Sequence, residues 1–320
     1  MNALSLVQRV SRRVPGYQQS EYLDEINAVY YDTWNYIVQL DESYFTDRQI
    51  VTVQSQAAQF DFLYNKGGAL SAAVSPRYVS IDMLEVNQPG DTNWIPATPL
   101  NWNSPEWLAI QQDSTSPAQT NPPYCFSQFS KGTFLFARPF LAGTQLRVTY
   151  TLGWLPLVIL NAGTVTSSGL SIAGTGTAFT QLVPPDFQAT SLPGQDIDVQ
   201  VAAEIILPAA NQTYQIDTIT NDFTATTRVA VSSVTDSAYT LASVPDIPQE
   251  HHPLIATMAT RNFMSTPGDD PRFTEWAALS QQGLDAMRDT VMTRQNLQPP
   301  RRGRFPFGLT RGTSFPSVSR

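Results

Sequence analysis

The chain has 320 residues, and 42% of them are hydrophobic, which is enough apolar content for the cores of two or three domains. Its only cysteine is Cys125, which excludes an intrachain disulfide and a cysteine-based metal site. The formal net charge is -8, but the last 22 residues carry five arginines and no acid. This asymmetry indicates a basic interaction arm on an acidic body, not a uniformly basic surface that binds nucleic acid.

Two amphipathic helices are predicted at the start of the chain. The first covers Leu4–Arg13 and is ended by the string VPG. The second covers residues 20–40, with Ser20 as N-cap, acids in its first turn and inward-facing residues at helical spacing, namely Leu23, Ile26, Tyr30, Thr33 and Ile37. The arginines within the first apolar stretch argue against a secretion signal, and no apolar run approaches the roughly 18 residues of a membrane span.

Three arginines of the first predicted helix are candidate contact residues: Arg9, Arg12 and Arg13. They could line a channel for DNA or pair with the acids of a partner protein. A solvated helix face is the alternative interpretation of the same residues.

A first β insertion is predicted over residues 48–156. The strings RQIVTVQSQ, AQFDFLYNK, RYVSIDMLEV, TFLFARPF and TQLRVTYTLGW have the alternation or composition of strands, and clusters of Pro, Gly and Asn separate them. The string QQDSTSPAQTNPPY is too polar for a core, and we expect it to form a loop.

A second β insertion is predicted over residues 157–249. It is rich in Gly, Ser and Thr near VTSSGLSIAGTGTAFTQL, which favours short, tightly turning strands over helix. From residue 161 to residue 250 the chain carries nine acids and only Arg228 as a base. A small barrel or sandwich is the natural closure for such strands.

Two further helices are predicted over residues 250–295, followed by an extended C-terminal arm over residues 296–320. The second of these helices has a Pro271 start and one inward stripe of Phe273, Trp276, Ala277, Ser280, Leu284, Met287 and Val291. In the shorter one the predicted stripe is Ile255, Met258, Ala259 and Asn262. The predicted fold class is therefore α+β. A split helical domain, formed by residues 1–47 and 250–295, would carry two inserted antiparallel barrel- or sandwich-like units and end in the arm.

Several strings, in this order, resemble the head-to-tail adaptor (connector) proteins of tailed bacteriophages. The strand LRVTYTLGWLPL is similar to the ending of the family's β insertion, and PPYCFSQFSKGTFLFARPF is similar to the turn and strands before it. The string VTSSGLSIAGTGTAFTQL, followed by TYQIDTITNDFTATT, resembles a β module of phage structural proteins, and HHPLIATMATRNFM resembles a C-terminal helix of these adaptors. The resemblance spans most of the chain.

This resemblance implies a mechanical and non-enzymatic role in the virion. A ring of copies, commonly twelve, joins the portal protein to the tail or nozzle protein below it. DNA passes through the axial channel during ejection without sequence-specific binding, and no membrane or cofactor is implied. Such particles are assembled in the cytoplasm of the bacterial host. By the same resemblance the C-terminal arm reaches into the portal.

The arm is predicted to gain its shape only against a partner. Fully extended, its last 22 residues would reach roughly 70 Å. Ordering them costs on the order of 20 to 40 kcal/mol, which three buried phenylalanines at about 1.5 to 3 kcal/mol each do not offset. We expect arginines to pair with portal acids and phenylalanines to fill pockets, the residues being Arg301, Arg302, Arg304, Phe305, Phe307, Arg311 and Phe315. A disordered tail and a nucleic-acid contact are the alternatives.

The chemical signals elsewhere in the chain have ordinary structural explanations. We expect His251 and His252 to begin a helix, not to bind a metal, and Cys125 to be a small buried residue. Two of the acids Asp196, Asp198 and Glu204 could form the carboxylate pair of a glycosidase. Only the distance between the two carboxylates in the folded chain decides whether they do. The glycines of AGTGTAF lack the Lys-Ser/Thr ending of a phosphate-binding loop, and turn glycines are expected.

Two other functions remain open from the sequence. One is a receptor- or glycan-binding module of the virion carried by residues 162–245, although that segment has no tryptophan. The other is an enzyme that acts on cell-wall glycan.

Overall fold

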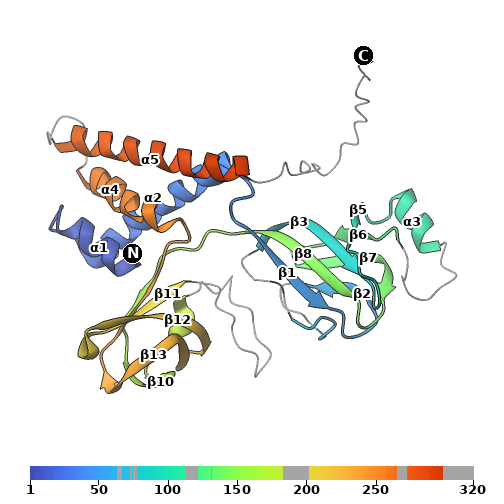
Figure 1. Cartoon of the computed structure of the whole chain (residues 1–320), viewed down its shortest axis with the longest axis horizontal. Helices are drawn as coiled ribbons and strands as arrows, with labels where there is room; N and C mark the ends of the chain where they lie inside the picture. The colour runs from blue at the N-terminus through green and yellow to red at the C-terminus, as the bar shows by residue number, and fades with distance from the viewer. Residues whose placement is uncertain are drawn as a thin grey trace, which may run out of the picture.

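The computed structural model describes residues 1–62, 67–72, 74, 78–112, 122–130, 132–182, 202–264 and 272–297. Its helices are α1 (Ala3–Ser11), α2 (Gln19–Leu40), α3 (Pro105–Gln112), α4 (His252–Phe263) and α5 (Arg272–Leu297). Figure 1 shows α1, α2, α4 and α5 grouped together, with one set of strands below them and another set to one side. None of the helices in the described ranges is long and apolar enough to cross a membrane.

Residues 46–152 form two four-stranded sheets around one core. The strands are β1 (Thr46–Thr52), β2 (Ala57–Asp61), β3 (Tyr78–Asn87), β4 (Ile95–Pro96), β5 (Thr98–Pro99), β6 (Cys125–Gln128), β7 (Thr133–Phe140) and β8 (Gln145–Leu152). One sheet has the order β1-β8-β3-β4 and the other β2-β7-β6-β5, and only β5 and β6 pair in parallel. Alternate residues of β8, such as Val148 and Tyr150, lie in the same buried cluster as Phe60 and Phe134 of the other sheet.

A six-stranded antiparallel sheet follows. Its strands are β9 (Ile159–Leu160), β10 (Thr164–Thr175), β11 (Ala203–Leu207), β12 (Gln212–Asn221), β13 (Thr224–Ser237) and β14 (Thr240–Ser243), in the order β10-β13-β12-β11-β14-β9. Before β10, Gly163 has a φ of +86°, and a Cβ atom there would collide with the backbone of Thr175 and Gly176. Only glycine allows this close approach of two chain segments.

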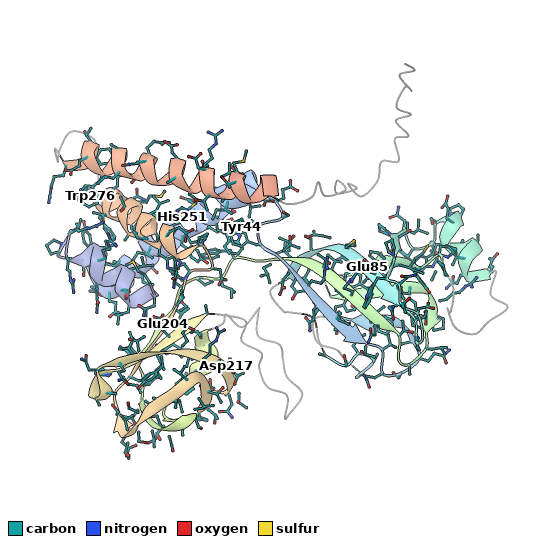
Figure 2. The ribbon with its side chains drawn as sticks, viewed as in Figure 1. Tyr44, Glu85, Glu204, Asp217, His251 and Trp276 are labelled. Atoms are coloured by element: carbon teal, nitrogen blue, oxygen red, sulfur yellow. The ribbon has the colours of Figure 1, made fainter. Side chains whose placement is uncertain are left out.

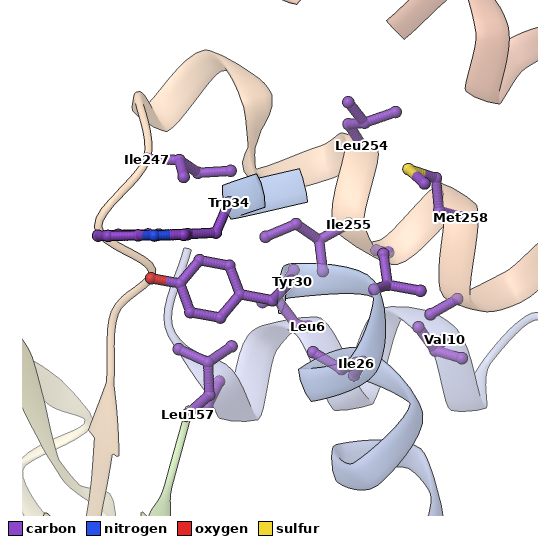
Figure 3. Close-up of a cluster of buried hydrophobic side chains, with 14 of the residues drawn as sticks. Leu6, Val10, Ile26, Tyr30, Trp34, Leu157, Ile247, Leu254, Ile255 and Met258 are labelled. Carbon is purple, nitrogen blue, oxygen red and sulfur yellow. The ribbon is translucent and has the colours of Figure 1, made fainter. Parts of the chain in front are cut away.

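The helical core contains residues from both ends of the chain and from the β part. Ile26 and Tyr30 of α2 pack with Leu6 of α1 and Ile255 of α4 (Figure 3). Met287 and Val291 of α5 belong to the same cluster, as do Leu157, Ala242 and Ile247 from the chain around β9 and β14. The Tyr30 hydroxyl accepts a hydrogen bond of 2.9 Å from the backbone N–H of Asp246, so α2 is also tied to the segment that leads into α4.

The helical periodicities are confirmed in most positions. In α5 the predicted stripe is the least exposed side of the helix, with Ser280, Met287 and Val291 buried. In α2 the buried side likewise contains Ile26, Tyr30, Thr33 and Ile37. Two details are wrong. Gln18, not Ser20, is the N-cap of α2, and Asn262 of α4 is exposed and donates to the Oε1 atom of Glu25 at 2.6 Å.

The predicted architecture is wrong, although the overall class is α+β. The described chain is mostly β with three sheets, not two inserted barrel- or sandwich-like units, and the helices do not form N- and C-terminal flanking domains. Their apolar faces form a single cluster together with residues of the β part, and a fifth helix, α3, contacts β7. The physical reason is that strand pairing between distant segments sets the number of sheets, which local periodicity does not report. The domain boundaries after residues 47, 156, 249 and 295 stay predictions, and the arm lies outside the described residues.

Candidate anion-binding face of the first helix

Helix α1 buries one side and presents arginines on the other. Its N-cap residue is Asn2, whose side chain accepts a hydrogen bond of 2.9 Å from the Ser5 N–H. The buried residues are Ala3, Leu6, Val7 and Val10, at helical spacing. Arg9 lies in the last turn of α1, Arg12 is its C-cap residue and Arg13 follows, so the helix ends two residues before the predicted Arg13 and all three arginines stand near its C-terminal end, where the helix dipole favours positive charge.

The three arginines line an open cleft of about 390 Å³. Its remaining walls are Met1, Ser5 and Gln8. Arg12 is exposed, and Arg9 and Arg13 are half-buried. One Arg9 nitrogen approaches the Met1 sulfur at 3.8 Å, and thioether sulfur is a weak acceptor. We call Arg9, Arg12 and Arg13 together the arginine face.

Arg13 joins α1 to α5. Its guanidinium carbon lies 4.4 Å from the ring centroid of Trp276, a cation–π contact, and Figure 2 shows Trp276 at the outer end of α5. The Nη1 atom of Arg13 is buried and has no hydrogen-bond partner among the described residues. Burial, and then the positive charge of Arg9, lower the pKa of Arg13. Burial removes the charge of Arg13 from water, and the like charge of Arg9 repels it.

No carboxylate within the described ranges neutralises the arginine face. The ion pairs seen there join Arg147 to Glu85 and Arg228 to Asp217, and neither involves α1. Three guanidinium groups without counter-charges beside an open cleft can bind oxyanions, because guanidinium forms paired hydrogen bonds with carboxylate or phosphate. The structure thus brings the three predicted residues together on one surface.

The predicted portal-binding residues of the arm lie outside the described residues. The last described element, α5, ends at Leu297. The roles of Arg301, Arg302, Arg304, Phe305, Phe307, Arg311 and Phe315 stay predictions.

The two histidines lie at the start of α4, as expected, and both are buried. The Met1 amino group lies 2.8 Å from the Nδ1 atom of His252, and the Nε2 atom of the same ring lies 2.9 Å from the carbonyl oxygen of Ile247. This arrangement fits a neutral ring that accepts at Nδ1 and donates at Nε2. Burial lowers the pKa of both His251 and His252. Within the part of the chain that the structure describes, no group of three or more His, Cys, Asp or Glu residues could hold a metal ion.

The other candidate groups have structural contacts. Cys125 is buried beside Trp107 and Ala137, and burial raises the pKa of its thiol, which disfavours the reactive thiolate. Glu204 accepts a hydrogen bond of 2.6 Å from the side chain of Asn2, which ties β11 to the start of α1. Asp196 and Asp198 lie outside the described residues.

The Gly/Thr string near residue 175 forms a turn next to a loop of the same sheet. The Thr177 hydroxyl donates a hydrogen bond of 2.6 Å to the carbonyl oxygen of Asp222, and Gly176 has a φ of +67°. The prediction of a turn glycine is therefore confirmed for Gly176, whereas Gly174 lies within β10.

Sequence reasoning missed the aromatic half of the candidate site. Trp276 was placed on the inward stripe of its helix, but nothing in the spacing indicated that it would lie under Arg13 from the opposite end of the chain. It also missed a pair of exposed aromatic side chains, Trp102 and Phe129, whose ring centroids lie 6.0 Å apart.

Comparison with known families and with curated protein sequences finds no family model and no curated protein that matches this chain.

Proposed function

We propose that this protein is a head-to-tail adaptor of a tailed bacteriophage. In this role it is a non-enzymatic virion subunit that forms a ring, joins the portal to the tail and leaves a channel for DNA. The proposal starts from the sequence resemblance. Its strings coincide with regular elements. LRVTYTLGW covers all of β8 except its first residue, TYQIDTITNDFTATT covers most of β12 and the start of β13, and HHPLIATMATRNFM contains α4.

The observation that carries the proposal is that no acid of the described residues neutralises the arginine face, on a chain whose net charge is -8. Like charges held together next to a cleft are stabilised when an anionic partner arrives. This is the expected property of a subunit that completes its surface by assembly with other chains.

The long outer helix α5 supports the same proposal. It has 26 residues, and among the side chains described along it only Ser280, Met287 and Val291 are buried. Leu279 and Met292 are exposed apolar residues on its remaining surface. A helix that is covered on one narrow side and carries apolar groups on its open side is suited to contact with a neighbouring subunit.

The first experiment removes the predicted portal-binding arm. Deletion of residues 299–320 should leave a folded protein with the melting temperature of the full chain, but one that no longer joins portal-containing heads to tails. A matched full-length variant, with Phe305, Phe307 and Phe315 changed to Ser, keeps every arginine and tests the aromatic anchors alone. Infectious particles assembled with the deleted chain would show that the arm has no role in joining.

The second experiment examines assembly directly. Electron microscopy of the full chain mixed with its portal protein should show a closed ring of copies, coaxial with the portal and with an open centre. A protein that stays monomeric and separate from the portal contradicts the proposal.

One observation favours a second function, a receptor- or glycan-binding protein of the virion. Trp102 and Phe129 are 54% and 63% exposed and meet edge to face. Trp102 follows β5 and Phe129 follows β6, so the pair lies in loops beside one of the four-stranded sheets and not in residues 162–245, where the sequence placed this alternative. Binding of the full chain to glycan arrays, lost in the Trp102→Ala variant, would support this function over the adaptor.

A further inference from the structure

Helix α2 carries negative charges on its outer side, the sign of charge that would neutralise the arginine face. From Gln19 to Leu40 it contains four acids, Glu21, Asp24, Glu25 and Asp32, and no lysine or arginine. At 100° per residue, these acids and Tyr31 fall on one side of the helix, opposite to the buried side that contains Ile26, Tyr30 and Ile37. Glu21, Asp24 and Asp32 are exposed, and Tyr31 is 48% exposed. We call these five residues the acidic stripe.

Part of the acidic stripe is already engaged within the chain. Glu21 accepts a hydrogen bond of 2.6 Å from the backbone N–H of Gln18, and Glu25 accepts one from the side chain of Asn262. Among the described residues, Asp24 and Asp32 have no hydrogen-bond or ion-pair partner. They are spaced by eight residues, about 12 Å along the helix.

Among the residues that the structure describes, the arginine face and the acidic stripe do not pair with each other. α1 and α2 contact each other, but they do so through the buried sides that contribute Leu6 and Ile26 to the helical core (Figure 3). Arg9 and Arg12 are not among the buried residues of α1, Arg13 packs on Trp276 of α5, and the acidic stripe lies on the outer side of α2. No ion pair joins the two helices within the described ranges.

We propose that the arginine face of one copy binds the acidic stripe of a second copy of this chain. The inference rests on the proposed ring-forming function and identifies a pair of surfaces that forms the ring. A contact between two different surfaces of identical subunits is heterologous, and such a contact repeats from copy to copy until the ring closes.

A second copy suits the arginine face better than DNA does. The chain is acidic overall, and the arginine face spans only the five residues from Arg9 to Arg13, whereas a phosphate-binding surface usually collects many bases over a wide area. Carboxylates at fixed positions on a rigid helix also satisfy the paired hydrogen-bond geometry of guanidinium. Contact with DNA is thus an alternative outcome of the experiment.

The experiment uses charge reversal in full-length protein. Variant A carries Arg9→Glu and Arg12→Glu, so that both of its surfaces are acidic. Variant B carries Asp24→Arg and Asp32→Arg, so that the acidic stripe loses its net negative charge and presents two arginines beside Glu21 and Glu25. Arg13 is retained because it packs on Trp276. Self-association is measured by analytical ultracentrifugation and by electron microscopy, and thermal unfolding verifies that each variant is folded.

Each variant alone should lose the ring and associate at least about tenfold more weakly than the wild type. An equal mixture should regain rings in which A and B alternate, because each A–B contact again joins opposite charges. Rescue by mixing identifies the two surfaces as partners, which a merely structural effect of the substitutions would not produce. The matched control is Arg228→Glu, which reverses an exposed arginine on β13 and should leave association unchanged.

Several results would overturn the inference. Rings that survive in A and B separately would exclude this pair of surfaces while leaving the adaptor function intact. Loss of DNA binding in A, without rescue of assembly by B, would assign the arginine face to DNA. A wild-type chain that stays monomeric at all concentrations overturns the inference. Rings that respond to charge reversal but never bind a portal would instead refute the adaptor function alone.

Discussion

Acidification should destabilise the helical core through His251 and His252. Both side chains are buried at the start of α4, with exposed fractions of 7% and 1%. Burial lowers the pKa of each from its usual 6.5, and the nearby Met1 amino group lowers the pKa of His252 further, while Glu250 partly opposes the shift at His251. In the unfolded chain each ring takes up a proton near pH 6.5, whereas in the folded chain it stays neutral to lower pH. Stability that is present above pH 6.5 is therefore lost as the pH falls toward the folded pKa values.

The size of this effect follows from linkage. A ring that takes up a proton only in the unfolded chain lowers the free energy of unfolding by at most about 1.4 kcal/mol between pH 7.5 and pH 5.5, so the two rings together lower it by at most about 2.7 kcal/mol.

Urea unfolding at pH 7.5 and 5.5, followed by tryptophan fluorescence, measures the difference. Trp34 lies in the helical core and reports on it. The control is the double variant His251→Asn and His252→Asn, whose amides do not titrate, and it should show a smaller pH dependence than the wild type whatever its absolute stability. Equal stability of the wild type at the two pH values would refute the reasoning from burial.

Two further predictions concern the β part. Gly163→Ala should lower the free energy of unfolding of the six-stranded sheet by about 2 to 4 kcal/mol, because the added Cβ combines a positive φ with a backbone collision. Gly169→Ala, at a φ of +61° with open space around it, should lower it by about 1 to 2 kcal/mol, and denaturant titration of both variants measures the difference. Glu85→Gln should lower the free energy of unfolding by about 2 to 4 kcal/mol, because Glu85 is largely buried and accepts two hydrogen bonds of 2.6 Å from Arg147. Asp217→Asn removes a largely exposed ion pair with Arg228 and should lower it by about 0.5 kcal/mol or less. Equal losses in either pair would contradict the structure at that site.

Local periodicity predicted the regular elements of this protein well. The inward stripe of α5 and the alternating strands near β7 and β8 could be read from residue spacing, because a helix or strand with one buried side repeats its apolar residues at a fixed period. The short helix α3 was not predicted, since eight residues with only Trp107 buried carry almost no periodic signal. The three arginines of α1 were also identified as a candidate surface from the sequence.

Pairing and burial were decided only by the tertiary structure. β1 and β2 are neighbours in the chain but lie in different sheets, and β1 pairs with β8, about a hundred residues away. In the same way, the sequence showed that Arg13 is charged but not that Trp276 covers it or that no acid of the described chain reaches it. The spacing of residues along one element determines which side of that element is apolar. Which distant surface covers that side, and which charges are left without a partner, depends on the packing of the whole chain.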